Sequence, residues 1–369
     1  MNFPTDYVSI RARMDTIDPV AYAASRNYDD GALTYLSPYL SRGVISTSHL
    51  MQLLFDKGYA FPQMEKLLQE LAWRDYWQLI WKNKGEGINQ DIRREQEGVL
   101  THGLAKGVLE ANTGIEVIDK KIAELYQSGY MHNHMRMYVA ALCTNIAGNH
   151  WKIPARWMYY HLLDGDWASN SLSWQWVCGT NSGKKYYANQ ENINRFFYST
   201  QSGTYLDTEY EALKTMKVPG QLYETIAWNE KTELPVAKTV RVNSQLPTLV
   251  YNYYNLDPLW HADEPCNRIL LLEPSVFEKY PISKHCVDWM LLLGKNIAHL
   301  QLFVGEFEEL KTLVKGGKVI FKEHPLNKHY EGIEEERAWM FQERGAYPSF
   351  FAFWKKCLKE LNAKGWIKN

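Results

Sequence analysis

Residues 164–176 read DGDWASNSLSWQW and gather three tryptophans and several polar side chains into one short stretch. We predict a helix that begins near Asp166. On such a helix Asn170 and Trp174 are four residues apart and lie about 40° from each other around the axis. Trp176 points elsewhere. The stretch therefore offers an amide and an indole to one ligand, and a second indole to a different pocket.

The composition is that of a globular protein with enough chain for two domains. The 369 residues are 46% hydrophobic and 22% charged, so a sizeable core can form. The 14 tryptophans and 24 tyrosines exceed what packing alone usually demands and suit a ligand with large flat faces. The net charge of −1 provides no global basic field, so any contact with nucleic acid must be local.

The cysteines and the amino terminus indicate a cytoplasmic protein. The five cysteines are odd in number and widely spaced without a C-x-x-C, which argues against a disulfide framework, a zinc ribbon or an iron–sulfur cluster. Residues 1–10 lack the charged start and apolar run of a signal peptide. No window approaches the ~20 apolar residues of a membrane span. We expect a reducing cytoplasm, no membrane partner and no metal, and leave the oligomeric state open.

Periodic apolar positions predict several helices in the first part of the chain. A helix at 64–81 would carry a carboxylate, a guanidinium and two indoles on one face, at i, i+3, i+4 and i+7: Glu70, Trp73, Arg74 and Trp77. A helix at 115–127 should end at Gly129. Another at 130–146 would place Asn133, Arg136 and Met137 on one side. Ser37 is expected to cap a helix that Pro38 opens.

The composition changes after residue 231. Four prolines between 232 and 267 predict an extended linker. Beyond it, apolar runs at 268–273, 300–304 and 318–322 alternate with helical patterns at 284–296 and 306–313. Strand–helix alternation of this kind predicts a small parallel α/β, Rossmann-like domain at 268–369.

Five motifs in order carry a resemblance to a known family. They are Leu36-Ser37-Pro38-Tyr39-Leu40, Glu70-Leu71-Ala72-Trp73-Arg74-Asp75, Thr113-Gly114 before Ile118-Asp119, Met131-His132-Asn133-His134-Met135-Arg136-Met137, and Leu163-Asp164-Gly165-Asp166 through Trp174-Gln175-Trp176. With them the chain resembles the helical flavin-binding domain of DNA photolyases and cryptochromes, closest to the cyclobutane pyrimidine dimer enzymes. The resemblance implies a multi-domain protein, with an all-α FAD-binding domain at 1–231 followed by the α/β domain. The family's usual N-terminal antenna domain is expected to be missing.

The resemblance implies a set of FAD contacts. Asn170 matches the asparagine beside the flavin N5, and Arg136 with Asp164 matches the ion pair that flanks the isoalloxazine. Asp166 matches an acidic residue near the ribityl and adenine contacts. The remaining implied cofactor contacts are Tyr22, Thr34, Ser37 and Arg74. Of these, Tyr22 and Ser37 match positions that hold the phosphates.

The resemblance also implies a pocket for damaged DNA. Glu70 matches the carboxylate that hydrogen-bonds a flipped pyrimidine dimer and stabilises its radical anion. Trp73 and Trp176 match the indoles that sandwich the dimer. The neighbouring contacts would be Asn133 and Met137, with Arg26 on the DNA backbone. Aromatic walls and a few polar groups are what an extruded dimer needs.

The implied activity is blue-light-driven repair of cyclobutane pyrimidine dimers by electron transfer from reduced FAD, as in a deoxyribodipyrimidine photolyase-like lyase. Trp174 and Trp151 match the first two members of the family's photoreduction chain. No Trp or Tyr between Lys82 and Tyr126 supplies the third, which leaves exits such as Trp157 or Tyr159. Leu33-Thr34-Tyr35 also replaces the family's Thr-Ser-Arg at the phosphates.

Other interpretations stay open. Trp73, Trp77 and Trp174 could be packing residues, Arg136 with Asp164 a structural pair, and Glu70 with Arg74 a helix-surface pair. The alternative function is a cryptochrome-like photoreceptor or redox flavoprotein without repair activity. A third is a helical nucleic-acid-binding or scaffold protein that has lost FAD. The 268–369 segment contains no glycine-rich phosphate loop, so the sequence does not support a second chromophore.

Overall fold

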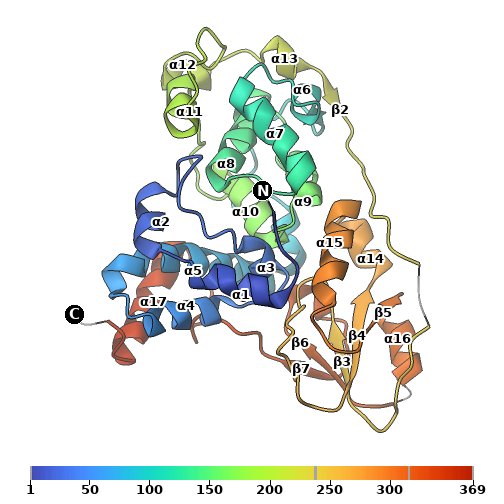
Figure 1. The fold of residues 1–369 in the computed structure, drawn as a ribbon. Coiled ribbons are helices and arrows are strands. Elements are labelled where there is room, and N and C mark those ends of the chain that lie inside the picture. Colours follow the sequence, from blue (N-terminus) through green and yellow to red (C-terminus); the bar gives the residue numbers. More distant parts are fainter. Residues whose placement is uncertain (1, 237–238, 315, 368–369) are drawn as a thin grey trace. The chain divides into compact units, whose positions relative to one another are not determined.

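The computed structural model describes residues 2–236, 239–314 and 316–367 (Figure 1). The chain forms two compact units. The first contains Ala24–Leu33 and Lys84–Glu230, and the second contains Asn2–Ala23, Thr34–Asn83 and Lys231–Asn369. This division differs from the predicted boundaries at 231 and 268, because the early helices belong to the same unit as the α/β sheet.

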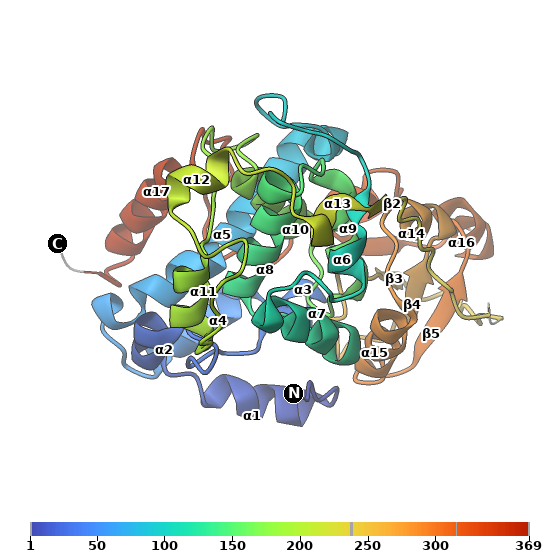
Figure 2. The same ribbon diagram turned by 90° about the horizontal axis from the view of Figure 1, so that it is seen from above.

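The regular secondary structure of the first unit is almost entirely helical (Figure 2). Its helices and short strands are η1 (Gly85–Asn89), β1 (Leu104–Ala105), α6 (Lys106–Leu109), α7 (Glu116–Ser128), α8 (Asn133–Ala141), η2 (Leu142–Ile146), α9 (Lys152–His161), α10 (Trp167–Val177), α11 (Gln190–Phe197), α12 (Tyr210–Lys214), α13 (Gly220–Tyr223) and β2 (Thr225–Ile226). β1 and β2 pair antiparallel. Gly129 ends α7 with φ 69°, as predicted, because glycine tolerates the left-handed conformation of a helix C-cap. The single helix predicted at 130–146 is instead α8 continued by the π-helical turn η2.

Helix α10 confirms the prediction made from its sequence. Asp166 is its N-cap, and the side chain accepts a hydrogen bond from the Ser169 backbone N–H at 2.7 Å. Trp174 is 2% exposed and belongs to the core cluster of this unit, which also contains Trp151. Trp176 is 39% exposed. The two indoles at the end of α10 therefore lie in different surroundings.

The second unit contains the N-terminal helices and the C-terminal helix. These are α1 (Tyr7–Asp15), α2 (Pro19–Ser25, whose last two residues fall in the first unit), α3 (Ser37–Ser41), α4 (Thr47–Asp56), α5 (Phe61–Lys84) and α17 (Phe350–Ala363). α5 confirms the predicted long helix and extends it. The expected cap at Ser37 is wrong: Leu36 occupies the N-cap position without a side-chain cap hydrogen bond, and Ser37 is already helical. No prediction covered α17.

A five-stranded parallel sheet completes the second unit, which confirms the predicted α/β pattern (Figure 1). Its strands lie in the order β5 (Leu300–Val304), β4 (Asn267–Leu272), β3 (Thr248–Tyr251), β6 (Val319–Lys322) and β7 (Ile333–Glu335). The connecting helices are α14 (Pro274–Lys279), α15 (Lys284–Gly294), α16 (Phe307–Val314) and η3 (Pro325–Asn327). The chain enters the sheet at its centre, builds one side with β4 and β5, and then returns to build the other side with β6 and β7.

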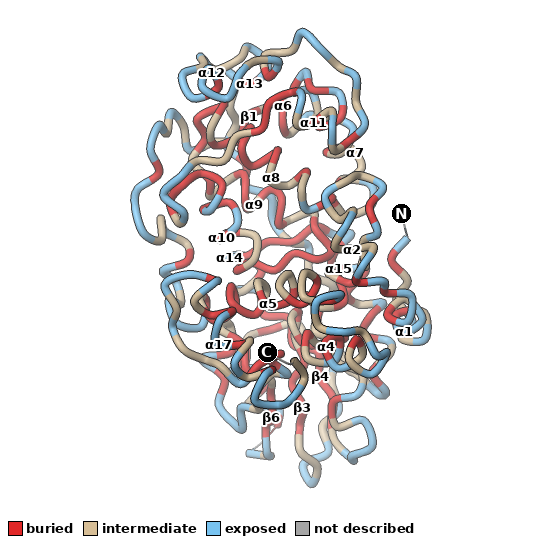
Figure 3. The backbone as a smooth tube through the Cα atoms, turned by 90° about the vertical axis from the view of Figure 1, so that its left-hand side faces the viewer, coloured by how far each residue is buried: buried red, intermediate tan, exposed pale blue. Residues whose placement is uncertain are grey.

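The predicted linker at 232–267 is wrong where it covers β3. All four residues of β3 are buried, as are all six of β4 (Figure 3). In sequence, a fully buried parallel strand is a short continuous apolar run. β3 has only four residues and begins directly after Pro247, so its apolar run is too short to recognise. Since β3 is the central strand, the α/β fold begins about twenty residues earlier than the sequence pattern indicated.

Candidate functional site

Arg136 and Asp164 form the ion pair that the resemblance implies. Arg136 Nη2 donates to both carboxylate oxygens of Asp164, at 3.0 and 2.9 Å, and its Nε donates to the Met131 carbonyl at 2.8 Å. The side chain of Asp164 is only 5% exposed. α8 provides the guanidinium, and the turn before α10 provides the carboxylate. The pair fixes a positive charge beside the start of α10, whether or not a ligand is present.

Asn170 lies on the second turn of α10 with its amide held in one orientation. Its Nδ2 donates to the Ala155 carbonyl of α9 at 2.8 Å. Its Oδ1 accepts no hydrogen bond from the part of the chain that the structure describes. The buried hydroxyl of Ser169 also has no hydrogen-bond partner there. A guanidinium, a carboxylate and an amide oxygen are a donor and acceptor set that fits the polar edge of a flavin.

The other implied cofactor contacts divide between the two units. Asp166 belongs to the first unit and caps α10. Tyr22, Thr34, Ser37 and Arg74 belong to the second unit. There, Thr34 Oγ1 accepts from the Leu36 N–H at 3.4 Å, and Arg74 Nη1 donates to Ser41 Oγ at 3.0 Å. The structure therefore brings together Arg136 and Asp164 in one unit, and Arg74 with the end of α3 in the other.

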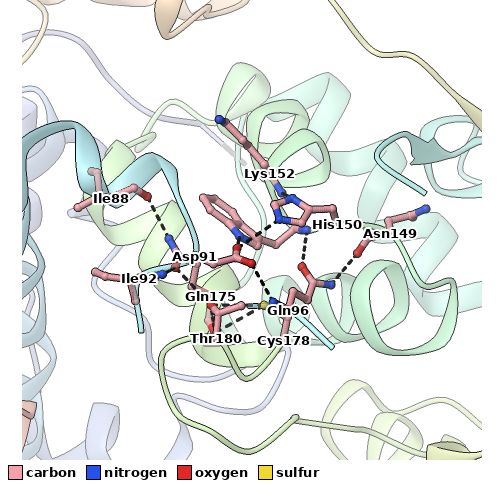
Figure 4. Close-up of polar contacts among 11 residues, drawn as sticks. Ile88, Asp91, Ile92, Gln96, Asn149, His150, Lys152, Gln175, Cys178 and Thr180 are labelled. Carbon is pink, nitrogen blue, oxygen red and sulfur yellow. Dashed lines mark hydrogen bonds and ion pairs between the residues drawn. The ribbon is translucent and has the colours of Figure 1, made fainter. Parts of the chain in front are cut away.

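Asp91, Gln96 and His150 belong to a polar network that the sequence did not predict (Figure 4), and this network also holds Trp151. Its indole Nε1 donates to Asp91 Oδ1 at 2.7 Å, and its backbone N–H donates to Gln96 Oε1 at 2.9 Å. Asp91 also accepts from the Gln96 N–H at 2.8 Å and lies 3.2 Å from His150 Nε2. Burial is the largest cause that lowers the pKa of His150. Asp91 lies in an irregular segment between η1 and β1, so no periodic pattern indicated it.

The two proposed electron exits are both buried. Trp157 and Tyr159 are almost completely inaccessible, so neither forms a surface exit by itself. Trp157 Nε1 donates to the hydroxyl of Tyr126 at 3.1 Å, and burial raises the pKa of Tyr126 to about 12. Tyr126 is only partly buried. Tyr126 and His161 are thus two partly exposed aromatic neighbours of Trp157.

Two of the implied dimer contacts on α5 have partners within the second unit. Glu70 pairs with Lys66 on the preceding turn at 3.0 Å, whereas Arg74 bonds Ser41. The ring of Trp73 stacks on Phe350 of α17, with centroids 3.8 Å apart and planes 11° from parallel. One face of the indole that was predicted to wall the dimer is therefore covered by the chain itself.

The remaining implied DNA contacts lie in the first unit. Asn133 is exposed at the start of α8, and Met137, one turn later, packs against the core cluster. Trp176 lies near Tyr186, with ring centroids 6.0 Å apart. Arg26 is half-buried. Asn133 and Trp176 are therefore accessible to a partner, while Met137 is also a packing residue.

Two kinds of feature are absent from the described ranges: a helix that could cross a membrane and a side-chain cluster that could hold a metal ion. None of the helices there has the length and apolar character that a bilayer crossing requires. Within the same ranges, no group of three or more His, Cys, Asp or Glu side chains is arranged to hold a metal ion.

Comparison with known proteins identifies the helical segment. Residues 67–233 match the sequence model of the FAD binding domain of DNA photolyase. This segment is similar to proteins of the photolyase and cryptochrome superfamily. A deoxyribodipyrimidine photo-lyase of Streptomyces griseus is 31% identical over 166 residues, which are 42% of this chain and 35% of that protein. A cryptochrome DASH of Ostreococcus tauri is 30% identical over 190 residues, 49% of this chain and 33% of that protein.

The likeness is partial in length and in structure. The chain spans about a third of the length of these two relatives. A cryptochrome from Synechocystis has a TM-score of 0.47 at 21% identity, over 53% of this chain and 44% of that one. The superfamily segment contains Arg136, Asp164, Asn170, Trp151 and Trp174. Several implied contacts fall before it: Tyr22, Arg26, Thr34 and Ser37.

Proposed function

We propose that this chain binds FAD and uses blue light to repair cyclobutane pyrimidine dimers in DNA as a photolyase-like lyase. The observations that carry the proposal are the Arg136–Asp164 pair and the fixed amide of Asn170, both within a segment that matches the FAD binding domain of DNA photolyase. FAD, when bound, supplies light-driven electron transfer. The protein orients the cofactor and sets its electrostatic surroundings.

Each residue has a separate task in this proposal. The amide oxygen of Asn170 would accept a hydrogen bond from the flavin N5 position when that nitrogen carries a proton. Arg136 would place a positive charge beside the ring and favour an anionic reduced flavin. Asp164 holds the guanidinium in place, and Asp166 fixes the first turn of α10, which positions Asn170. Tyr22, Thr34, Ser37 and Arg74 would contribute the other cofactor contacts.

We expect Arg136→Leu to weaken FAD binding by about tenfold or more, because hydrogen bonds to charged groups are worth about 1.5–3 kcal/mol. The measurement is flavin absorbance per chain after purification and titration of the apoprotein with FAD. Arg195→Leu, which removes an exposed arginine on α11, is the matched control and should bind FAD normally. A colourless wild-type protein that takes up no added FAD would contradict the proposal.

The repair step is tested with a dimer-containing oligonucleotide under blue light. Glu70→Gln and Trp176→Ala should each reduce repair while the flavin spectrum stays unchanged, since both residues are proposed to contact the dimer and not the cofactor. Trp73 and Trp176 are the two indoles proposed to sandwich the dimer, and Trp176 is the exposed one. Loss of flavin in either variant would show that the residue belongs to the cofactor pocket instead.

A second candidate function is a light-sensing or redox flavoprotein without repair activity. The stacking of Phe350 on Trp73 favours it, because one face of the indole is unavailable to a pyrimidine dimer. The same blue-light assay separates the two candidates. A flavin that is photoreduced normally, together with an unrepaired oligonucleotide, would identify the second.

We expect Asp91→Asn to lower the yield of flavin photoreduction by about tenfold. If Trp151 passed an electron towards the flavin through Trp174, its oxidised indole would become a stronger acid, and transfer of the Nε1 proton to the Asp91 carboxylate at 2.7 Å would slow the return of the electron. Replacing a charged acceptor by an amide removes about 1.5–3 kcal/mol of interaction, and each 1.4 kcal/mol is a factor of ten in rate. Transient absorption of the tryptophan radical is the measurement. An unchanged neutral-radical yield in the variant would assign the proton to another acceptor.

A further inference from the structure

The α/β sheet of the second unit has a topological switch point between β3 and β6. From β3 the chain builds outward on one side through β4 and β5, and β6 begins the other side. In open parallel sheets, ligands bind outside the carboxyl ends of the strands at this position. A cavity of about 160 Å³ lies there. Its lining includes residues that directly follow β3, namely Asn252, Tyr254 and Asn255, and residues that directly follow β6, namely Glu323 and His324.

The opposite wall of the cavity comes from the helices of the same unit. The segment from Leu40 to Thr47 between α3 and α4 lines it, together with Arg74 of α5. The two walls are joined closely: the Leu256 N–H donates to the Arg42 carbonyl at 2.8 Å. Gly43 has φ 66°, and a Cβ there would lie 2.5 Å from the Tyr254 carbonyl oxygen. The cavity is therefore a built feature with fixed walls, and glycine is required where they meet.

Positive charge is concentrated around this cavity. Arg74, Arg337 and Lys322 line it, and the fully buried Arg42 lies beside it with Cζ 3.3 Å from the centre of the Tyr253 ring. The pKa of His324 is well below its usual range because of burial first, and then because of Arg337, Arg42 and Arg74. These three guanidinium groups therefore surround one neutral imidazole.

The carboxylates in the wall leave an excess of positive charge. Glu323 accepts hydrogen bonds from Lys82 Nζ and, at 3.0 Å, from Trp339 Nε1, so a lysine outside the cavity balances it. Lys322 is paired with Glu335 at 3.3 Å. Asp257 is the other acidic lining residue, and burial raises its pKa, which favours its neutral form. Arg74 and Arg337 thus dominate the field inside the cavity.

Two lining residues carry buried donors that have no partner among the described residues. The first of these donors is His324 Nε2. His324 Nδ1 accepts a hydrogen bond from the Leu326 N–H at 3.2 Å, so the proton of the neutral ring is on Nε2. The other is Asn255 Nδ2. His324 is 6% exposed and Asn255 8%. An unsatisfied buried donor costs about 1–3 kcal/mol, so a ligand with several acceptor oxygens would gain this energy on binding.

We propose that this cavity binds a small phosphate-bearing ligand, with the guanidinium groups of Arg74 and Arg337 and the buried N–H groups of His324 and Asn255 as its donors. A phosphate presents enough oxygens to use all of them, and arginine matches its geometry. The stacked rings of Tyr254 and His324, 4.2 Å apart and 19° from parallel, hold the wall rigid. Of the implied FAD contacts, only Arg74 lines this cavity, so the two proposals share that one guanidinium group.

The ligand could be inorganic phosphate or the phosphate of a nucleoside monophosphate, and one titration series distinguishes them. Calorimetry of the full chain with sodium phosphate, with adenosine 5′-monophosphate and with sodium chloride at matched ionic strength should show saturable binding of at least one phosphate compound and none of chloride. Tighter binding of the nucleotide assigns a phosphate ester, and equal affinity assigns the phosphate group alone. Absence of saturable binding for both would overturn the proposal.

Two variants and a matched control tie the binding to the cavity. Arg337→Gln and Asn255→Leu should each weaken it by about tenfold or more, since each removes a donor to an anion. Arg241→Gln makes the same chemical change at an exposed arginine of the same unit and should have no effect. Arg337 also donates to Gln78 Oε1 at 2.9 Å, so thermal unfolding confirms that each variant is folded. Equal affinity in all three folded variants would place the ligand elsewhere.

Discussion

Replacing Trp73 by alanine should lower the free energy of unfolding by about 2–3 kcal/mol, at or just below the lower end of what truncation of a buried tryptophan costs, because Trp73 is half-buried. The indole packs face to face on Phe350 and lies 4.8 Å from the Trp77 ring and 5.7 Å from the Tyr76 ring, measured between centroids. Its loss would remove one of the aromatic contacts that join α5 to α17, which also include Tyr76 with Phe350 and Phe353. Urea denaturation of the two proteins measures the difference.

The matched comparison is Trp176→Ala, which truncates the same side chain at an exposed position. We expect it to change stability by less than about 1 kcal/mol, because surface substitutions usually have small effects. Trp73→Phe should recover most of the loss, since it keeps a ring against Phe350. The opposite pattern, in which Trp73→Ala leaves stability unchanged but abolishes dimer binding, would show that Trp73 is a substrate wall after all.

The helices of the superfamily segment could be predicted because their signals are local. α10 begins at an Asp that caps it, α7 ends at a glycine, and α5 shows a long periodic face. The pair of Arg136 with Asp164 joins residues 28 positions apart, and only the resemblance to a family indicated it. Local patterns contain no information about such a contact, because it depends on how α8 packs beside α10.

The features that were missed are the ones that depend on tertiary packing. β3 is four residues long and follows a proline, so its central place in the sheet is set by pairing with β4 and β6 and not by its own pattern. Asp91 reaches Trp151 across 60 positions from an irregular segment. The cavity at the switch point combines the ends of β3 and β6 with Arg74 of α5, and no short motif marks it. The aromatic content indicated a ligand with large flat faces, but not that Phe350 would cover Trp73.

Replacing Asp75 by alanine should also lower the free energy of unfolding by about 3 kcal/mol, for a different physical reason. Asp75 is buried on α5, where its carboxyl group accepts from Thr47 Oγ1 at 3.1 Å and from the Met340 N–H at 2.9 Å. Alanine would leave both donors without this acceptor, and each unsatisfied buried group costs about 1–3 kcal/mol. Asp75→Asn keeps one acceptor oxygen and should cost less. Urea denaturation at neutral pH separates the three proteins.

The Asp75→Asn comparison also has a pH dependence of defined sign. Burial raises the pKa of Asp75 in the folded protein, although Arg337 opposes the shift. Between the unfolded pKa of about 3.9 and the raised folded pKa, the folded chain keeps a proton that the unfolded chain releases, so stability contributed by Asp75 falls as pH rises. The free energy of unfolding of the wild type minus that of Asp75→Asn should therefore be largest near pH 4. This difference should decrease toward neutral pH, by about 1.4 kcal/mol for each unit by which folding raises the pKa of Asp75. A difference that grows with pH would mean that Arg337 and the hydrogen bonds outweigh burial and that Asp75 is ionised in the folded protein.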